Sequence, residues 1–469
     1  MLGIGVSATL IAAVLAASIP RGSSDDSSGS AVAAPAPSAP AVELVVAEVA
    51  RPAVEPSLQS IAAEAEPVAA SEPVTEPPPV AASEPVADPA LGAIGTTGLA
   101  AQIAELLAST QRLLEPSSVA ADPADDAAAK TSTGKTRKKS RRAKKEKPST
   151  KRKLTLVKTI SGGGLSPKSI VADQNGQVFA MNMMYNHNVT VFDKRYKRVK
   201  VITDKVDLSK FGFRQYPQQV QGAPVEAAVA PDGEHIYVSN YTMYGPGFAN
   251  QGFDLCTPRD KIDRGFVYQI STSTLRKTDA IRVGRVPKYL AITPNGRYLL
   301  VGNWCSWDIS VVDLRTNTEI RRIDAGVAPR GIAFSPNGKT AYVTLVGEHK
   351  ILVIDMKTFE VKRVISGLGK RPRHLVMSPN GRFLYITVQG EDKPKRADGR
   401  ILKYDTRKRE VVARSVPLVE PRTTVLSEDG KSLFVVDYHP GTVVKLKASD
   451  LKTLDSKYLG YHPIGVTYD

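Results

Sequence analysis

The chain has 469 residues, a formal net charge of +16 and only two cysteines. Its charge is segregated: residues 1–129 carry 3 basic against 16 acidic side chains, residues 130–153 carry 13 basic against one acidic, and the remaining residues, 154–469, are left with a net +17. The sequence holds no Gly-x-Ser-x-Gly elbow, no phosphate-binding loop and no cysteine–histidine pairing, which excludes enzymes built on those motifs.

Residues 1–22 are predicted to be a signal peptide or an N-terminal membrane anchor. The run from Leu2 to Ile19 is uncharged and mostly apolar, and Pro20-Arg21-Gly22 follows it. Such a segment directs export, so we expect an extracellular or envelope-associated protein, anchored through residues 2–19 if the segment is retained. A buried core helix is the alternative interpretation of this run.

Residues 23–129 are predicted to form a disordered acidic stalk. Their composition shifts to Ala, Pro, Glu, Ser and Val, and the hexapeptide Ala-Ala-Ser-Glu-Pro-Val occurs at 69–74 and again at 81–86. Such a segment buries too little apolar surface to offset the entropy lost on ordering. Within it, residues 99–114 place leucines at helical spacing, which predicts either a short amphipathic helix against a partner or membrane, or a transient helix in the linker.

Residues 130–153 form a basic linker. Its densest run, 137–145, would indicate nucleic-acid binding in a cytosolic protein. Behind an export segment, the same run is suited to an anionic envelope polymer, acidic lipid headgroups or the acidic stalk of the same molecule. A solvated linker and true nucleic-acid binding remain the alternatives.

From residue 154 onward a repeat occurs six times: a proline, an apolar segment, an Asn-Gly or Asp-Gly turn, a second apolar segment and two further strand-like runs. These turn dipeptides between alternating apolar residues are strong hairpin signals. The later prolines are spaced by 42, 43, 49 and 42 residues, the period of a four-stranded propeller blade. We therefore predict an all-β propeller over residues 154–469. The turn glycines are Gly176, Gly233, Gly296, Gly338, Gly381 and Gly430, and the prolines are Pro167, Pro224, Pro287, Pro329, Pro372, Pro421 and Pro463.

The two cysteines lie in corresponding loops of neighbouring blades. Cys256 falls in a long insertion, roughly 242–264, between the second and third strands of blade two, and Cys305 lies in the same loop of blade three. Since these loops share one face of a propeller, we expect a disulfide in an oxidising compartment. Two buried thiols are the alternative.

Two segments carry a family resemblance. Residues 229–240 (Val-Ala-Pro-Asp-Gly-Glu-His-Ile-Tyr-Val-Ser-Asn) and 335–344 (Ser-Pro-Asn-Gly-Lys-Thr-Ala-Tyr-Val-Thr) resemble the repeat of the YVTN family of bacterial β-propellers, also called YncE-like. Other segments, such as 303–308 and 462–469, are similar to an exported branch of that family. The resemblance implies seven blades closed by an N-terminal outer strand and three C-terminal strands.

The seventh blade departs from that plan. Residues 154–160 can supply its outer strand and 464–468 its innermost strand, but nothing after them makes the middle two. We expect seven-bladed geometry with an incomplete seventh blade and exposed strand edges. A tighter ring of six blades is the alternative.

A basic residue follows five of the opening prolines, and only blade two, with Val225-Glu226, breaks the series. Because the crossover leads into the innermost strand, these bases are predicted to ring the mouth of the channel and to attract anions. Pairing of each base with a local acid is the alternative, and enzymatic use of the ring is a third. The five bases are Lys168, Lys288, Arg330, Arg373 and Arg422.

Aromatic and histidine side chains suggest two further sites. Tyr241, Tyr244, Phe248, Trp304 and Trp307 gather in blades two and three, where they suit sugar stacking or protein anchoring, or the packing of the insertion. The candidate metal ligands His187, His439 and His462, near Asp437, form a weak set because no spacing motif supports them.

These observations favour a non-enzymatic, exported binding module for an anionic polymer or a protein ligand. We expect a monomer without cofactor or metal. A lactonase-like hydrolase is one alternative, although it would need carboxylates and histidines where the sequence offers bases. A nucleic-acid-binding propeller is the other.

Overall fold

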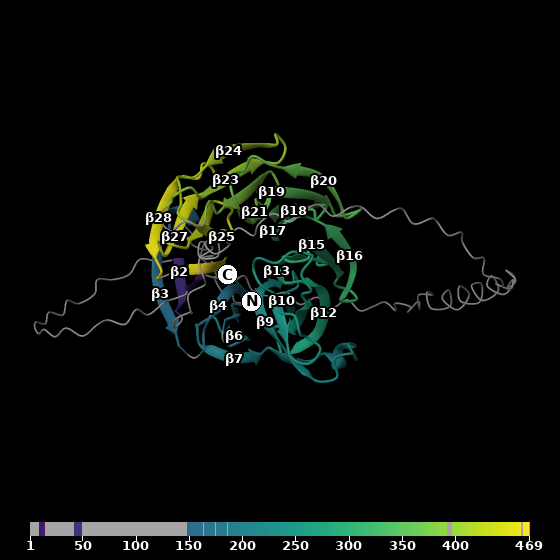
Figure 1. Cartoon of the computed structure of the whole chain (residues 1–469). Coiled ribbons are helices and arrows are strands. Elements are labelled where there is room, and N and C mark those ends of the chain that lie inside the picture. Colours follow the sequence, from purple (N-terminus) through teal and green to yellow (C-terminus); the bar gives the residue numbers. More distant parts are fainter. Residues whose placement is uncertain are drawn as a thin grey trace, which may run out of the picture. The chain divides into compact units, whose positions relative to one another are not determined.

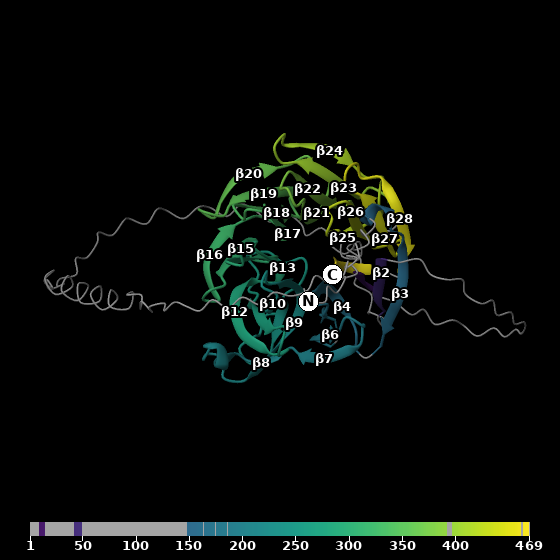
Figure 2. The same cartoon turned by 180° about the vertical axis from the view of Figure 1, so that it is seen from behind.

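A ring of β-sheets makes up the described part of the chain. The structure is a computed structural model, and it describes residues 9–14, 42–48, 148–391 apart from 163, 174 and 185, 396–460 and 463–468. Figures 1 and 2 show the sheets following one another around a central axis. The helix predicted over 99–114 and most of the basic linker lie outside the described residues.

Six sheets follow the predicted repeat in chain order. Blade one holds β4 (Pro167–Ala172), β5 (Val178–Asn182), β6 (Asn188–Phe192) and β7 (Arg198–Thr203). Blade two holds β8 (Lys205–Asp207), the 3-10 helix η2 (Leu208–Phe211), β9 (Gln219–Val229), β10 (His235–Tyr244), β11 (Arg264–Ser271) and β12 (Lys277–Arg285). Blade three holds β13 (Pro287–Ile292), β14 (Tyr298–Asn303), β15 (Asp308–Asp313) and β16 (Thr318–Asp324).

The next three blades repeat the same antiparallel order. Blade four holds β17 (Pro329–Phe334), β18 (Thr340–Leu345), β19 (Lys350–Asp355) and β20 (Glu360–Ile365). Blade five holds β21 (Pro372–Met377), β22 (Phe383–Val388), β23 (Arg400–Asp405) and β24 (Glu410–Arg414). Blade six holds β25 (Pro421–Leu426), β26 (Ser432–Asp437), β27 (Thr442–Lys447) and β28 (Thr453–Tyr458).

The Asn-Gly and Asp-Gly turns close the first hairpin of each blade, as predicted. All six turn glycines have positive φ, between 65° and 79°. In the turn before β18, the Asn337 side chain accepts a hydrogen bond from the backbone N–H of Lys339 at 3.1 Å. This Asx geometry and a left-handed glycine together explain why the dipeptide recurs, since a side chain is strained at that φ.

Apolar side chains fill the space between neighbouring sheets. Leu300 and Ile309 of blade three pack with Val343 and Ile354 of blade four, and all four are fully buried. Strands that are buried on both faces consist of short runs of branched apolar residues. This composition favours strands over helices in these segments.

The seven innermost strands contact one another in a closed cycle. The order is β4, β9, β13, β17, β21, β25 and β29 (Pro463–Tyr468), and β29 returns to β4. Six of these strands begin at the predicted crossover proline, and Pro224 lies within β9. The ring is therefore seven-bladed, and the six-bladed alternative is wrong.

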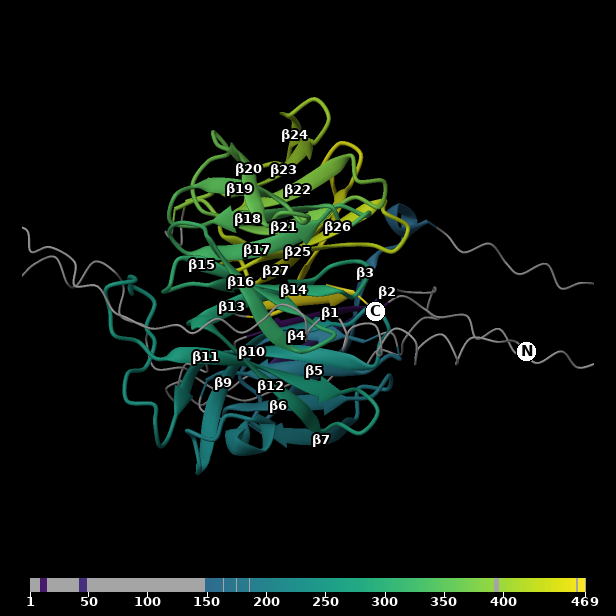
Figure 3. The ribbon, with the colours of Figure 1, turned by 90° about the vertical axis from the view of Figure 1, so that its right-hand side faces the viewer.

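The seventh sheet is completed from the N-terminal region. Residues 154–468 supply β3 (Leu154–Ser161), which follows the 3-10 helix η1 (Ser149–Lys151), and β29 to this sheet. Between them lie β1 (Thr9–Val14) and β2 (Val42–Glu48), in the order β29-β1-β2-β3. Figure 3 shows purple β1 beside yellow β29.

The expectation that nothing supplies the middle strands is thus corrected. β1 is antiparallel to β29, whereas β2 is parallel to both β1 and β3. Parallel neighbours require long connections rather than hairpins, and residues 15–41 and 49–153 provide them. β1 falls within the segment interpreted as a signal or anchor, and β2 within the predicted stalk. Among the described residues, no helix is long and apolar enough to cross a membrane.

Candidate ligand-binding site

The residues after the crossover prolines lie on β-bulges of the innermost strands. In blades one, three, four, five and six, the strand register shifts directly after Pro167, Pro287, Pro329, Pro372 and Pro421. A bulge inserts one extra residue and re-aims the adjacent side chain. The sequence repeat located these positions, but it carried no signal for the bulge.

Two hydrogen bonds cross the channel between blades that are not neighbours. Arg330 of blade four donates to Glu226 of blade two at 2.9 Å, and Tyr289 of blade three meets Nε2 of His374 of blade five at 3.0 Å. Each pair skips one blade of the ring, so the four side chains reach into the channel and meet there. The channel is consequently occupied by polar side chains at this level.

The Arg330–Glu226 ion pair is buried. Burial raises the pKa of Glu226, while Arg330 opposes that shift, and burial likewise lowers the pKa of Arg330 against the pull of Glu226. Burial lowers the pKa of His374 to about 3, with Arg330 and then Arg373 adding to the effect, so this imidazole is neutral. In the sequence, Val225-Glu226 interrupts the series of bases that follow the crossover prolines. In the structure, Glu226 neutralises one of those bases, Arg330.

A second carboxylate, Glu420, holds the bases of blades five and six. Glu420 is fully buried, forms an ion pair with Arg422, accepts a hydrogen bond from Gln389 Nε2 at 2.7 Å and lies 2.7 Å from His439 Nε2. The Asp437 carboxylate accepts the backbone N–H of Glu420 at 2.7 Å. Asp437 therefore fixes the crossover ahead of β25, and it is engaged with backbone groups.

Arg373 is the base with the least compensation. Its side chain is buried, its NH1 donates to the neutral Gln389 Oε1 at 2.7 Å, and its Nε has no acceptor among the described residues. Burial lowers the pKa of Arg373 well below its ordinary value, Arg330 and Arg422 act in the same direction, and Glu420 opposes the shift. The Nε of Arg422 likewise lacks an acceptor within the described part of the chain.

The bases are thus placed at the channel, but not as solvated loop charges. Four of the five are buried or nearly so, and three of these four have acidic partners, which agrees with the alternative of local pairing. Lys168 is half-buried and contributes to the field at Glu226. The expectation that bases gather there without carboxylates or histidines is wrong, because Glu226, Glu420 and His439 share the site.

Lys288 lies in a separate cage made by the insertion and blade three. Its Nζ is 2.7 Å from Asp254 Oδ1, 3.8 Å from the Trp304 ring centroid and 5.2 Å from that of Tyr241. Burial lowers the pKa of Lys288 to about 7, against the opposing effect of Asp254. Two of the predicted aromatic residues are therefore used to hold a lysine of this chain.

The remaining aromatic candidates do not form one stacking surface. Tyr244 stacks on His187 with ring centroids 5.1 Å apart. Phe248 stacks on Tyr216 at 4.6 Å within the blade-two core. Trp307 is half-buried at the turn between β14 and β15. These contacts match the alternative in which the aromatics pack the insertion.

Cys256 and Cys305 form a disulfide, with their Cα atoms 5.2 Å apart. The bond joins the insertion of blade two to the loop after β14. Both residues are buried together with Ile262 and Val286. Val286 precedes Pro287 and has a φ of 52°, an unusual conformation for a β-branched residue, so this corner is locally strained.

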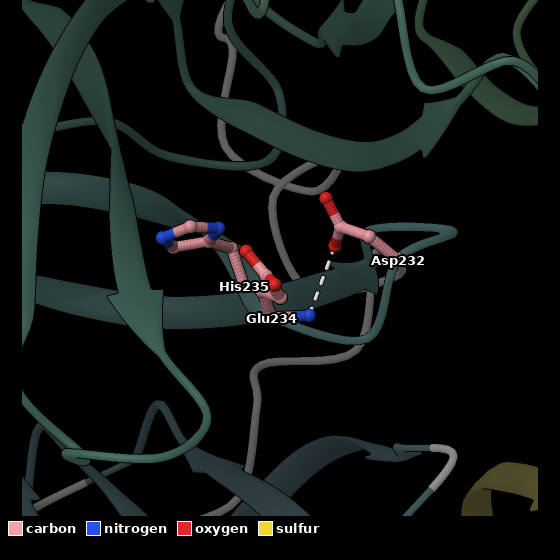
Figure 4. Close-up of side chains that lie close together, drawn as sticks. All are labelled: Asp232, Glu234 and His235. Atoms are coloured by element: carbon pink, nitrogen blue, oxygen red, sulfur yellow. Dashed lines mark hydrogen bonds between the residues drawn. The ribbon is translucent and has the colours of Figure 1, made fainter. Parts of the chain in front are cut away.

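The predicted histidines do not assemble a metal group within the described residues. Burial lowers the pKa of His187, His439 binds Glu420, and His462 lies outside the described residues. Asp232, Glu234 and His235 are the one potential metal-ligand group in this part of the chain. Figure 4 shows them at the turn before β10, where Asp232 accepts the backbone N–H of Glu234 at 2.9 Å. Both carboxylates are exposed, and this hydrogen bond is an ordinary turn contact.

Comparisons with known proteins support the propeller fold. A family model described as Lactonase, 7-bladed beta-propeller matches residues 203–324, and one described as Cytochrome D1 heme domain matches residues 337–457. No curated protein matches the chain. A solved structure, hydrazine synthase of Kuenenia stuttgartiensis, is similar at 20% identity and a TM-score of 0.48, and the match covers 62% of this chain and 79% of that chain. The chain is a β-propeller, and its resemblance to the YVTN branch stays a prediction.

Proposed function

We propose that the protein is a non-enzymatic propeller that binds an anionic group at its central channel. The observation that carries the proposal is the buried guanidinium of Arg373, which among the described residues hydrogen-bonds a neutral amide and forms no ion pair. Arg330 and Arg422 lie close enough to lower its pKa, and Glu420 opposes them. Among the described residues, two carboxylates, Glu226 and Glu420, form ion pairs with these three guanidinium groups. The site therefore has an excess of positive charge.

The donors favour an oxyanion. A buried charge is costly without a partner, so an anion that reaches Arg373 stabilises the folded protein as it binds. Guanidinium groups hydrogen-bond carboxylates and phosphates through planar pairs of N–H donors, and the buried Nε atoms of Arg373 and Arg422 have no acceptor among the described residues. The two cross-channel hydrogen bonds disfavour a polymer threaded through the ring, so the ligand would present a terminal group.

The ligand class therefore remains an anionic polymer or a protein that presents a carboxylate or phosphate group. We further propose that the protein acts outside the cytoplasm, at the cell envelope. The Cys256–Cys305 disulfide supports this location, because such bonds persist in oxidising compartments.

The test is a calorimetric titration of the full chain with inorganic phosphate and with succinate, at low and moderate salt. Wild type is expected to bind and to weaken as salt rises. Arg373→Gln should lose binding at least about tenfold while its unfolding midpoint stays the same or rises, because the change removes a poorly compensated charge. Lys370→Gln is the matched control, since Lys370 precedes β21 and its side chain is 58% exposed.

Two outcomes would overturn the proposal: wild type that binds neither anion, or Arg373→Gln that binds with unchanged affinity and salt dependence. A joint replacement of Arg330, Arg373 and Arg422 is not a clean test. Removing Arg330 or Arg422 leaves a buried carboxylate without its cation, which unfolds the site rather than emptying it.

A lactonase-like hydrolase is the second candidate. The Lactonase model matches residues 203–324, which include Glu226. The structure also brings Glu420 to within 2.7 Å of His439, a carboxylate–imidazole pair that can act in general base catalysis. Hydrolysis of a panel of lactones, lost in Glu420→Gln, would favour this candidate over a binding module.

A further inference from the structure

The insertion of blade two contains residues 250–257, which we call the strap and which turn at Asp254 and Leu255. Its Asp254 is the centre of a group of contacts. Asp254 Oδ1 lies 2.7 Å from Lys288 Nζ and accepts the Tyr241 hydroxyl at 3.0 Å. The Asp254 carbonyl accepts Trp304 Nε1 at 2.8 Å. Three elements thus converge on one residue of the strap.

Side chains of the strap alternate between the two faces. Asp254 and Cys256 point toward blade three, where they meet Lys288 and Cys305. Phe253 and Leu255 are exposed, with Leu255 at 63%. The strap therefore presents Asp254 to Lys288 and leaves the apolar side chains on either side of Asp254 exposed.

The acid covers the lysine from the solvent side. The Asp254 side chain is 60% exposed, whereas that of Lys288 is only 10% exposed. Removal of the acid would open Lys288, Tyr241 and Trp304 to solvent as a cationic group flanked by aromatic rings. Burial raises the pKa of Asp254, but Lys288 more than offsets this and holds that pKa below its ordinary value.

Covalent and steric anchors fix the strap at both sides of Asp254. The Cys256–Cys305 disulfide follows it by two residues. Gly252 precedes it by two, and a Cβ at Gly252 would overlap Cγ2 of Val286, so only glycine permits this approach. The acid is therefore presented to Lys288 at a high effective concentration.

We propose that Lys288, Tyr241 and Trp304 form a second carboxylate-binding site, which the chain fills with its own Asp254. The ligand that fits this site in place of the strap is a peptide that presents an acidic residue to Lys288 as Asp254 does. The disulfide keeps the site filled. Arg330 and Lys168 of the channel act on the charge of Lys288, but the contacts of Lys288, Tyr241 and Trp304 described above do not include Arg373, and the inference does not rest on the proposed function.

A dithiol can reduce the Cys256–Cys305 disulfide and so release the strap from its covalent anchor. The dithiol supplies two electrons and two protons, the Cys256–Cys305 bond breaks to give two thiols, and the dithiol becomes a cyclic disulfide. The strap then loses its covalent anchor, and Asp254 competes less well with an external acid. The reduced protein should bind an acidic peptide more tightly than the oxidised protein.

The test uses the full chain with Asp254→Ala and a fluorescent peptide of the sequence Asn-Gln-Gly-Phe-Asp-Leu, which reproduces residues 250–255. Fluorescence anisotropy should show binding at least about tenfold tighter than to oxidised wild type, since the tethered competitor is gone. The same peptide with Asn in place of Asp should not bind. Lys288→Met added to the Asp254→Ala chain should abolish binding, whereas Lys370→Gln should not.

Two further arms guard against misfolding. Acetate should raise the melting temperature of Asp254→Ala but not that of wild type, and reduced wild type should gain peptide binding. Retention of peptide binding by Arg373→Gln in the Asp254→Ala chain would separate this site from the channel. The proposal is overturned if a folded Asp254→Ala chain neither binds the Asp peptide nor responds to acetate, or if the Asp and Asn peptides bind alike.

Discussion

Replacing Asp204 with asparagine should remove a pH dependence from the stability of blade two. Asp204 precedes β8, is fully buried, and its Oδ2 has no hydrogen-bond partner within the described residues. Burial raises its pKa to about 7 from an ordinary 3.8, and Lys277 opposes the shift. The folded state thus favours the neutral acid.

The direction and magnitude of this pH dependence follow from the difference between the pKa of Asp204 in the folded and unfolded states. A raised folded pKa means that the stability is fully present below about pH 4 and is lost as the pH rises to about 7. At roughly 1.4 kcal/mol per pKa unit, a shift of about three units corresponds to a loss of about 4 kcal/mol for wild type. Asparagine cannot ionise, so Asp204→Asn should keep that stability at pH 8.

The assay is urea unfolding of the full chain at pH 5, 6, 7 and 8, followed by fluorescence. Other groups also titrate: burial lowers the pKa of Lys288 to about 7 from 10.5, which adds stability as the pH rises between these values. The difference between wild type and Asp204→Asn cancels such terms. Equal pH slopes for the two proteins, at equal m-values, would refute the reasoning.

Four further results are expected. Glu226→Gln should lower the free energy of unfolding by about 3–5 kcal/mol, because it leaves Arg330 buried without a carboxylate, and an unchanged urea midpoint would contradict the buried ion pair. Gly252→Ala should destabilise by about 1–3 kcal/mol, because its Cβ overlaps Val286, which a thermal melt can check. Non-reducing mass spectrometry should find the Cys256 and Cys305 peptides linked. Removal of residues 1–48 should expose the edges of β3 and β29 and promote association in sedimentation, whereas a monomer of unchanged stability would show that β1 and β2 are dispensable.

Local chemistry made the blades predictable from sequence. An Asn-Gly turn such as Asn337-Gly338 encodes its own hairpin, and a repeat period near 43 residues encodes the blade. Seven blades could be predicted because the six repeats leave one outer strand, residues 154–160, and one inner strand, residues 464–468, for a further blade. The middle strands of blade seven could not be predicted, since parallel pairing through long connections has no local turn signal.

The site was predictable only in part. Arg330, Arg373 and Arg422 could be predicted to lie at the channel because each follows a crossover proline. Equivalent positions of a repeat lie at the same distance from the axis of the ring. The partner of Arg330 could not be read in the same way. Glu226 lies two blades away, so the pair exists only after the ring closes, and both residues are aimed by the curvature and bulges of their strands.

The two sides of the ring differ in how their charge is balanced, and this difference argues for where a ligand binds. On the side of blade three, the chain supplies Asp254 to Lys288 through a strap secured by a disulfide. On the side of blade five, Arg373 hydrogen-bonds an amide and forms no ion pair among the described residues, whereas Arg330 and Arg422 form ion pairs with Glu226 and Glu420. A fold selected for stability alone would gain by replacing Arg373 with a neutral residue, since a poorly compensated buried charge costs free energy. Its presence is accounted for if an external anion completes the site, with its charged group directed at blades five and six.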